Sequence, residues 1–167
     1  MTARRRCLAA AVILVVAFTG CNGDDGASLP PDVGVVVTVI DGDTIDIEIG
    51  GRDERVRLIG IDTPELHTDT GAPECMSGEA RTFTESYLPA GTEVRLERDI
   101  VGRDDYGRLL AYVFRRGDDV LINELIVAAG YARPLTIAPN DAHRRRFVDA
   151  AHTAEASALG LWRTCAG

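Results

Sequence analysis

The sequence predicts a mixed β/α domain, a five-stranded Greek-key barrel of the OB type with three helices. Five short segments show the β-branched or alternating patterns of strands, and three longer segments place apolar residues at helical spacing. The 167 residues are 46% hydrophobic, which is enough for a core. Many short strands are typical of small barrels. An α+β open sandwich is the alternative, because propensity does not separate the two.

Five segments are expected to form the barrel strands. The first is rich in valine, and the second and fourth alternate apolar and polar residues. Gly50 and Gly51 supply a turn before the third strand, and a Tyr-Gly turn precedes the fifth. The expected strands are residues 33–40, 44–49, 55–61, 93–100 and 109–116.

The first two helices are marked by residues suited to helix ends. Ser77 can cap a helix over residues 78–87, since serine accepts hydrogen bonds from the first turn. A second helix is expected over residues 121–129, with Gly130 just beyond its end.

The third helix is predicted to begin after Asn140 or Asp141 and to end at Gly160. Four of its residues share one face at helical spacing, and small side chains suit close packing against a sheet. These residues are Phe147, Ala151, Ala154 and Ala158.

The N-terminus reads as a targeting segment. Three arginines precede an apolar stretch too short to span a bilayer, which indicates a signal peptide over residues 1–20. Thr19-Gly20-Cys21 resembles a bacterial lipobox, although Phe18 departs from the usual aliphatic residue. Lipidated Cys21 would anchor an extracytoplasmic protein to the membrane through a flexible tether, residues 21–32, ahead of a domain over 33–167. Ordinary secretion is the alternative.

Two cysteines remain in the exported domain. Export leads to an oxidising compartment, so Cys75 and Cys165 are expected to form a disulfide. Two free thiols are the alternative.

The net charge of the chain bears on which partners the protein can bind. The net charge is −8, and removal of residues 1–20 takes away three arginines and no acid, which leaves −11. This charge opposes long-range attraction of nucleic acid, but local arginines and a bound cation can reverse it at one site. Three histidines spread along the chain make a His-rich zinc or iron site unexpected.

Carboxylates and arginines gather in three segments, residues 39–44, 57–65 and 104–108. Asp43 and Asp62 offer the hard oxygen ligands that calcium prefers. Glu65 can orient or deprotonate a water, and Arg57 and Arg108 can grip a phosphate with two donors each. Together they predict metal-assisted cleavage of a phosphodiester.

The segments also resemble the staphylococcal nuclease (thermonuclease) family over about residues 36–162. The resemblance rests on residues 39–44, 57–65, 104–112, 122–125, 139–140 and 161–162. It implies an OB barrel with three helices and calcium-dependent endonucleolysis of DNA and RNA to 3′-phosphates. It assigns calcium to Asp43, Asp62 and the Thr63 carbonyl, phosphate to Arg57 and Arg108, the general base to Glu65, the metal surroundings to Asp41 and the terminal phosphate to Tyr106.

Three positions depart from the family pattern. Asp105 stands where the resemblance implies a lysine, and Leu135 and Ile137 stand where it implies tyrosines that contact the nucleotide. Loss of base stacking predicts weaker substrate binding with an intact cleavage centre. The competing functions are an idle barrel, used as a nucleic-acid-binding or adhesion lipoprotein, and a calcium-stabilised structural domain. A monomer is the default expectation.

Overall fold

The computed structural model describes residues 29–68 and 71–165. The predicted signal peptide, the lipidated Cys21 and most of the predicted tether lie outside these residues. At the start of the described part, the Asp32 carbonyl accepts a hydrogen bond from Leu96 N at 2.8 Å. The chain therefore joins the barrel immediately before the first strand.

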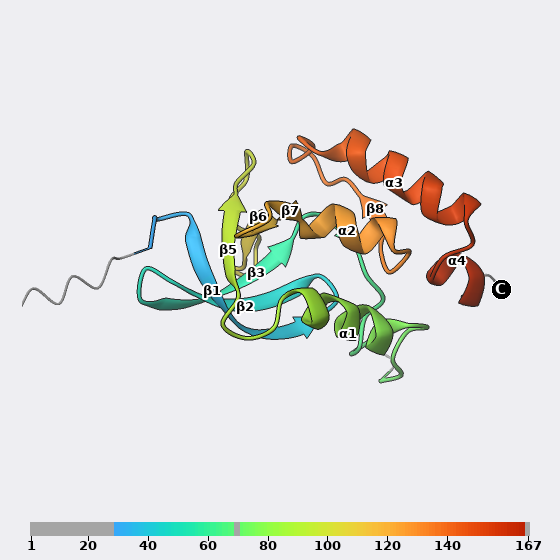
Figure 1. Cartoon of the computed structure of the whole chain (residues 1–167), viewed down its shortest axis with the longest axis horizontal. Helices are drawn as coiled ribbons and strands as arrows, with labels where there is room; N and C mark the ends of the chain where they lie inside the picture. The colour runs from blue at the N-terminus through green and yellow to red at the C-terminus, as the bar shows by residue number, and fades with distance from the viewer. Residues whose placement is uncertain (1–28, 69–70, 166–167) are drawn as a thin grey trace, which may run out of the picture.

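Five strands close into a barrel, as the sequence predicts (Figure 1). Around the barrel they follow the order β3-β2-β1-β5-β6, and parallel pairing of β3 with β6 closes the ring. The strands are β1 (Val33–Asp41), β2 (Thr44–Ile49), β3 (Arg52–Leu58), β5 (Glu93–Glu97) and β6 (Leu109–Arg115).

A second, two-stranded sheet was not predicted. The expected third strand over residues 55–61 is divided, because the chain turns at Gly60 with φ +81°. A side chain there would lie 2.4 Å from the Phe147 ring, so this turn requires glycine. Beyond it, β4 (Gly60–Asp62) pairs with β8 (Arg133–Leu135). The short β7 (Val120–Leu121) pairs antiparallel with the end of β6.

The helices gather on one side of the barrel, where α2 lies between α1 and α3 (Figure 1). Gly130 follows α2 with φ +81°, as the sequence predicts. The short α4 was not expected as a separate helix. The helices are α1 (Ser77–Tyr87), α2 (Ile122–Ala128), α3 (Arg144–Ala156) and α4 (Leu161–Thr164).

Two predicted helix caps are wrong. Ser77 is the first residue of α1 and is buried, while Met76 takes the cap position with φ 65° and no capping side chain. At the start of α3 the cap position belongs to His143, again without a side-chain bond. The Asn140 amide is engaged elsewhere, because it bonds both to the N–H and to the carbonyl of Val101.

The predicted end of α3 is also wrong. The helix stops at Ala156, and Ala158 is exposed in a left-handed turn with φ 48°. Gly160 precedes α4. Phe147, Ala151 and Ala154 are buried as expected. The fourth barrel strand stops at Glu97, short of residue 100, because Asp99 turns to accept hydrogen bonds from Tyr112 and Ala142.

The core fills the barrel and continues under α2 and α3. No helix in the described ranges is long and apolar enough to cross a membrane. A disulfide joins Cys75, in the loop before α1, to Cys165, directly after α4. The largest fully buried side chains are Tyr112, Phe147, Ile45, Ile47, Leu58, Ile61, Leu88, Leu109, Ile122, Ile126, Val36 and Val39.

Candidate active site

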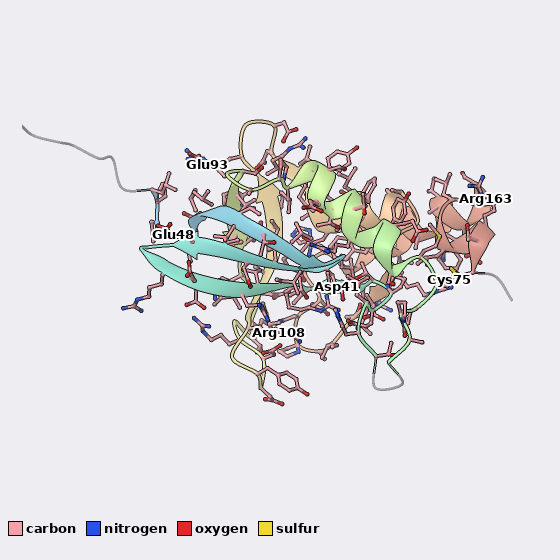
Figure 2. All side chains as sticks on the ribbon, turned by 90° about the horizontal axis from the view of Figure 1, so that it is seen from below. Asp41, Glu48, Cys75, Glu93, Arg108 and Arg163 are labelled. Carbon is pink, nitrogen blue, oxygen red and sulfur yellow. A yellow bond between two sulfur atoms is a disulfide. The ribbon has the colours of Figure 1, made fainter. Side chains whose placement is uncertain are left out.

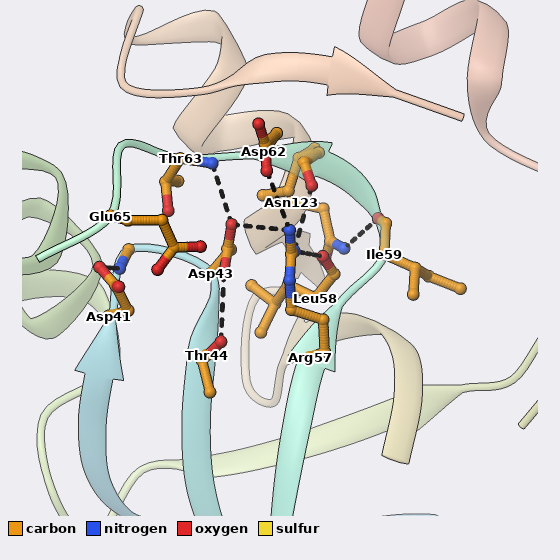
Figure 3. A network of polar contacts seen from close by, with 12 residues as sticks. Asp41, Asp43, Thr44, Arg57, Leu58, Ile59, Asp62, Thr63, Glu65 and Asn123 are labelled. Atoms are coloured by element: carbon orange, nitrogen blue, oxygen red, sulfur yellow. Dashed lines mark hydrogen bonds and ion pairs between the residues drawn. The ribbon is translucent and has the colours of Figure 1, made fainter. Parts of the chain in front are cut away.

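The tight turn between β1 and β2 carries the first acidic residues (Figure 3). Its Gly42 carbonyl accepts a hydrogen bond from the buried Thr84 hydroxyl of α1 at 2.6 Å. A side chain at Gly42 would meet that of Thr63 at 2.8 Å, so the glycine lets the two segments touch. The turn therefore places Asp41 and Asp43 against the end of β4.

Asp43 is the most enclosed carboxylate of this group, at 1% exposure. It accepts hydrogen bonds from Thr63 N at 2.9 Å and from the Thr44 hydroxyl at 3.1 Å. Its second neighbour is the Arg57 guanidinium, with Nη2 at 3.0 Å from Oδ2. Burial raises the pKa of Asp43 above its usual value, although Arg57 and the hydrogen bonds from Thr63 and Thr44 act in the opposite direction.

Arg57 neutralises two carboxylates at once. Its Nη1 donates to the Leu58 carbonyl at 2.6 Å and to the Ile61 carbonyl at 3.1 Å, which fixes the side chain over the end of β3. Its Nη2 pairs with Asp43 and, at 3.3 Å, with Asp62. Main-chain carbonyls therefore orient the guanidinium, and its positive charge balances the negative charges of Asp43 and Asp62.

Glu65 completes the acidic group, since its carboxyl lies between Asp41 and Asp43 (Figure 3). Burial raises the pKa of Glu65 to about 7, assisted by a hydrogen bond with Asp41 and by the negative charges of Asp41 and Asp43. Asp41 itself accepts hydrogen bonds from Gly42 N at 2.8 Å and Leu66 N at 3.4 Å. The structure thus places the carboxyl groups of Asp41, Asp43 and Glu65 beside one another, and Arg57 links Asp43 to Asp62.

The donor chemistry of this group suits a hard cation. Asp41, Asp43 and Asp62 offer carboxylate oxygens, the ligand type that calcium prefers, and the buried Thr63 hydroxyl makes no hydrogen bond within the described residues. The acids are not preassembled: within the described ranges no three His, Cys, Asp or Glu side chains are spaced to hold a metal. Arg57 instead supplies the positive charge between Asp43 and Asp62.

A cavity of about 420 Å³ opens on the other side of Arg57, and Arg108 also lines it. The Arg108 Nε donates to Asp104 at 2.6 Å, and its terminal nitrogens have no partner in the part of the chain that the structure describes. Tyr106 stands at the mouth, 87% exposed, with the Arg108 guanidinium 5.6 Å from its ring. Arg57, Arg108 and Tyr106 therefore face one space.

Aliphatic side chains also line the cavity. Leu135 and Ile137 are among its lining residues, and so is Asp105. Sequence reasoning missed Arg103, which also lines the cavity and pairs with Glu54 at 2.7 Å. No motif marks Arg103 because its position depends on the fold of the loop before β6. Asp43, Asp62 and Glu65 do not line the cavity, so Arg57 is the link between the acidic group and this space.

Two further polar side chains near the site have structural partners. The His143 ring is half-buried, contacts Tyr112 at 4.4 Å between centroids and bonds Glu97 at 2.8 Å. The Asn123 amide accepts a hydrogen bond from Val113 N and donates one to the Ile59 carbonyl.

Fold and site together define a class: an OB-type barrel whose rim carries carboxylates joined through an arginine to a cavity lined by arginines and aliphatic side chains. Within that class, the chain belongs to the staphylococcal nuclease family, because the family model described as "Staphylococcal nuclease homologue" matches residues 55–164.

Relatives resemble the chain over most of its length. It is 38% identical over 158 residues to the thermonuclease of Staphylococcus intermedius, covering 92% of each protein. It is 35% identical over 127 residues to the thermonuclease of Staphylococcus hyicus, covering 76% of this chain and 73% of the relative. It is 32% identical over 125 residues to the SPbeta prophage-derived endonuclease YokF of Bacillus subtilis (strain 168), covering 74% of this chain and 41% of that protein.

Proposed function

We propose that this protein is a calcium-dependent endonuclease that hydrolyses phosphodiester bonds of DNA and RNA outside the cytoplasm and leaves 3′-phosphate products. The observation that carries the proposal is the position of Arg57, which contacts Asp43 and Asp62 on one side and lines the cavity with Arg108 on the other. Two relatives named thermonuclease and one named endonuclease support the same activity.

Asp43, Asp62 and the Thr63 carbonyl would hold the calcium ion, with Asp41 beside them. When bound, the ion supplies positive charge against the phosphate oxygens. Glu65 faces the same rim, where its carboxylate can orient the attacking water and take its proton. The acidic group thus provides the nucleophile side of an in-line displacement.

Arg57 and Arg108 would bind the phosphate. The Nη1 of Arg57 stays fixed by two carbonyls. Among the described residues, its Nη2 pairs with Asp43 and Asp62. It would be available to the phosphate where the cation, rather than the guanidinium, balances these acids. Arg108 already has free donors toward the cavity within the described structure. The two planar guanidinium groups can stabilise the negative charge that develops on the phosphate oxygens. Tyr106, at the mouth of the cavity, can contact a terminal phosphate.

We infer a signal peptide over residues 1–20, a lipid anchor on Cys21, a tether over 21–32 and a monomeric nuclease domain over 33–167. The Cys75–Cys165 pair supports this location, since disulfides persist in oxidising compartments.

The test is cleavage of single-stranded DNA and of RNA by the chain without residues 1–20, with calcium and with EGTA. Calcium should support cleavage of both, and EGTA should abolish it. Arg108→Ala should lower the rate by about 10²–10³-fold, the usual effect of one lost transition-state donor. Arg116→Ala is the matched control, because Arg116 is exposed and pairs with Glu93 at 2.8 Å. Undiminished cleavage in EGTA would refute the calcium mechanism, and tight DNA binding without cleavage would favour the idle binding barrel.

A further inference from the structure

The loop that begins at Glu65 has few internal contacts to hold it. We define the Glu65 loop as residues 65–68 and 71–76, the described residues that follow Pro64 and precede α1. None of these residues belongs to the buried core, which resumes at Ser77. Segments with few buried contacts open at low free energy. The position of the Glu65 carboxyl therefore depends on the few bonds that the loop does make.

Glu74 clamps Glu65 through two bonds. The Glu65 N–H donates to Glu74 Oε2 at 2.9 Å, and the Glu74 N–H donates to the Glu65 carbonyl at 2.9 Å. The two ends of the loop are thus tied to each other. Outside the loop, the Leu66 N–H donates to Asp41 at 3.4 Å, the Glu65 carboxyl bonds Asp41, and the Glu74 carbonyl accepts from Ser77 N at 3.1 Å. None of these ties is covalent, so a covalent fixed point beside Glu74 would hold the clamp more firmly.

Cys75, the next residue, provides that fixed point through its disulfide to Cys165 (Figure 2). Cys165 directly follows α4 and bonds back to it, from its N–H to the Leu161 carbonyl at 3.0 Å. Leu161 N in turn donates to the Gly130 carbonyl at 2.8 Å, at the end of α2. Cys165 is therefore attached to the helical part of the core.

Met76 shows that the chain is constrained at this point. Its φ of 65° lies in the left-handed region that L side chains rarely adopt. Such a conformation persists only where the surrounding structure imposes it. Here the disulfide on one side and the buried start of α1 at Ser77 on the other fix its ends.

We propose that the Cys75–Cys165 disulfide is a positioning device for Glu65, acting through the Glu74 clamp. The proposal rests on the proposed nuclease function, in which Glu65 serves the attacking water. Two-electron reduction by a dithiol converts the bridge to two thiols while the dithiol closes to its own disulfide. The barrel and its core stay folded, but the Glu65 loop loses its attachment to α4. Activity is then redox-dependent although neither cysteine touches the substrate.

The experiment compares oxidised protein, protein reduced with dithiothreitol, and the Cys75→Ser/Cys165→Ser variant, all well below their unfolding temperatures. We expect kcat on single-stranded DNA with calcium to fall by about ten-fold in both bridge-free forms, because small displacements of a catalytic group are costly. KM should stay within about two-fold, since Arg57 and Arg108 lie outside the loop. Glu74→Ala should reproduce the fall, and Glu74→Gln, which keeps an acceptor oxygen, should restore most of the rate.

Val33→Ala is the matched control for lost stability, because Val33 is buried at the far end of β1 from Asp41. It should lower the unfolding free energy with kcat unchanged. Unchanged kcat in the bridge-free forms would overturn the positioning role and leave the disulfide as a stabilising crosslink.

A second readout separates this proposal from the nuclease activity itself. Hydrogen exchange of the Glu65 amide should accelerate by at least about ten-fold on reduction, while exchange in the barrel core stays unchanged. If the oxidised protein cleaves no nucleic acid, the proposed nuclease function fails. Hydrogen exchange of the Glu65 amide alone then tests whether the disulfide holds the loop. Equal protection of the Glu65 amide in both redox states would then refute the clamp.

Discussion

Removal of Arg57 tests the electrostatic arrangement of the site. In Arg57→Ala, Asp43 would keep its burial and lose its counter-charge, because Arg57 and Asp43 are 13% and 2% exposed in their side chains. Breaking a buried pair from one side costs roughly 3–5 kcal/mol. Asp43 keeps hydrogen bonds from Thr63 and Thr44, and Asp62 is 54% exposed and contributes little. We therefore expect a loss of about 3 kcal/mol in unfolding free energy.

Urea unfolding, followed by fluorescence of Trp162, the single tryptophan, provides the assay. Arg55→Ala is the matched control on the same strand, because Arg55 is 50% exposed and pairs with Asp46 at 2.8 Å. It should cost less than about 1 kcal/mol. Calcium should reduce the gap between Arg57→Ala and wild type, since in the folded variant it would bind more tightly and replace the positive charge that Asp43 has lost. A loss no larger than that of Arg55→Ala would refute the role of Arg57 as the counter-charge of Asp43.

Three further predictions concern other parts of the molecule. Burial alone would raise the pKa of Asp99, but hydrogen bonds from backbone amides and from the Tyr112 hydroxyl hold it below its usual value. Asp99→Asn should therefore be less stable than wild type at pH 7, and the gap should close as the pH falls below about 4 in pH-dependent urea titrations. Thr84→Val should cost about 1–2 kcal/mol in the same assay, because it leaves the Gly42 carbonyl without its 2.6 Å partner. Leu135→Tyr should strengthen binding of a nucleotide by about 1–3 kcal/mol in calorimetry, since it adds a stacking ring to the cavity wall; unchanged affinity would mean that bases do not reach Leu135.

The barrel was predictable from the sequence because each strand carries its own local pattern. The division of the third strand was not, because Gly60 lies within a continuous apolar run. Its turn depends on contact with Phe147, which is distant in sequence. The pairing of β4 with β8 follows from that turn and was missed for the same reason. The cap at Ser77 was misjudged because Ser77 is already the first, buried residue of α1. The cap at Asn140 was misjudged because its side chain bonds Val101 instead.

The sequence predicted which residues form the acidic group but not how they are arranged in space. Asp-Gly-Asp and Asp-Thr-Pro-Glu identify residues without showing that Arg57 lies between Asp43 and Asp62. That arrangement depends on the register of β2 with β3, in which Thr44 stands opposite Arg57. The clamp between Glu65 and Glu74 likewise depends on how the loop returns to α1. The roles assigned to these residues stay predictions.

The most direct test of calcium-dependent phosphodiester cleavage is a calcium titration of DNA cleavage by metal-free protein, with the chemistry of the product ends determined in the same assay. We predict no cleavage before calcium is added, a saturable rise in rate as it is added, and products that end in 3′-phosphates. A cleavage rate that does not depend on calcium would contradict this prediction. So would saturable calcium binding with the phosphodiester left intact.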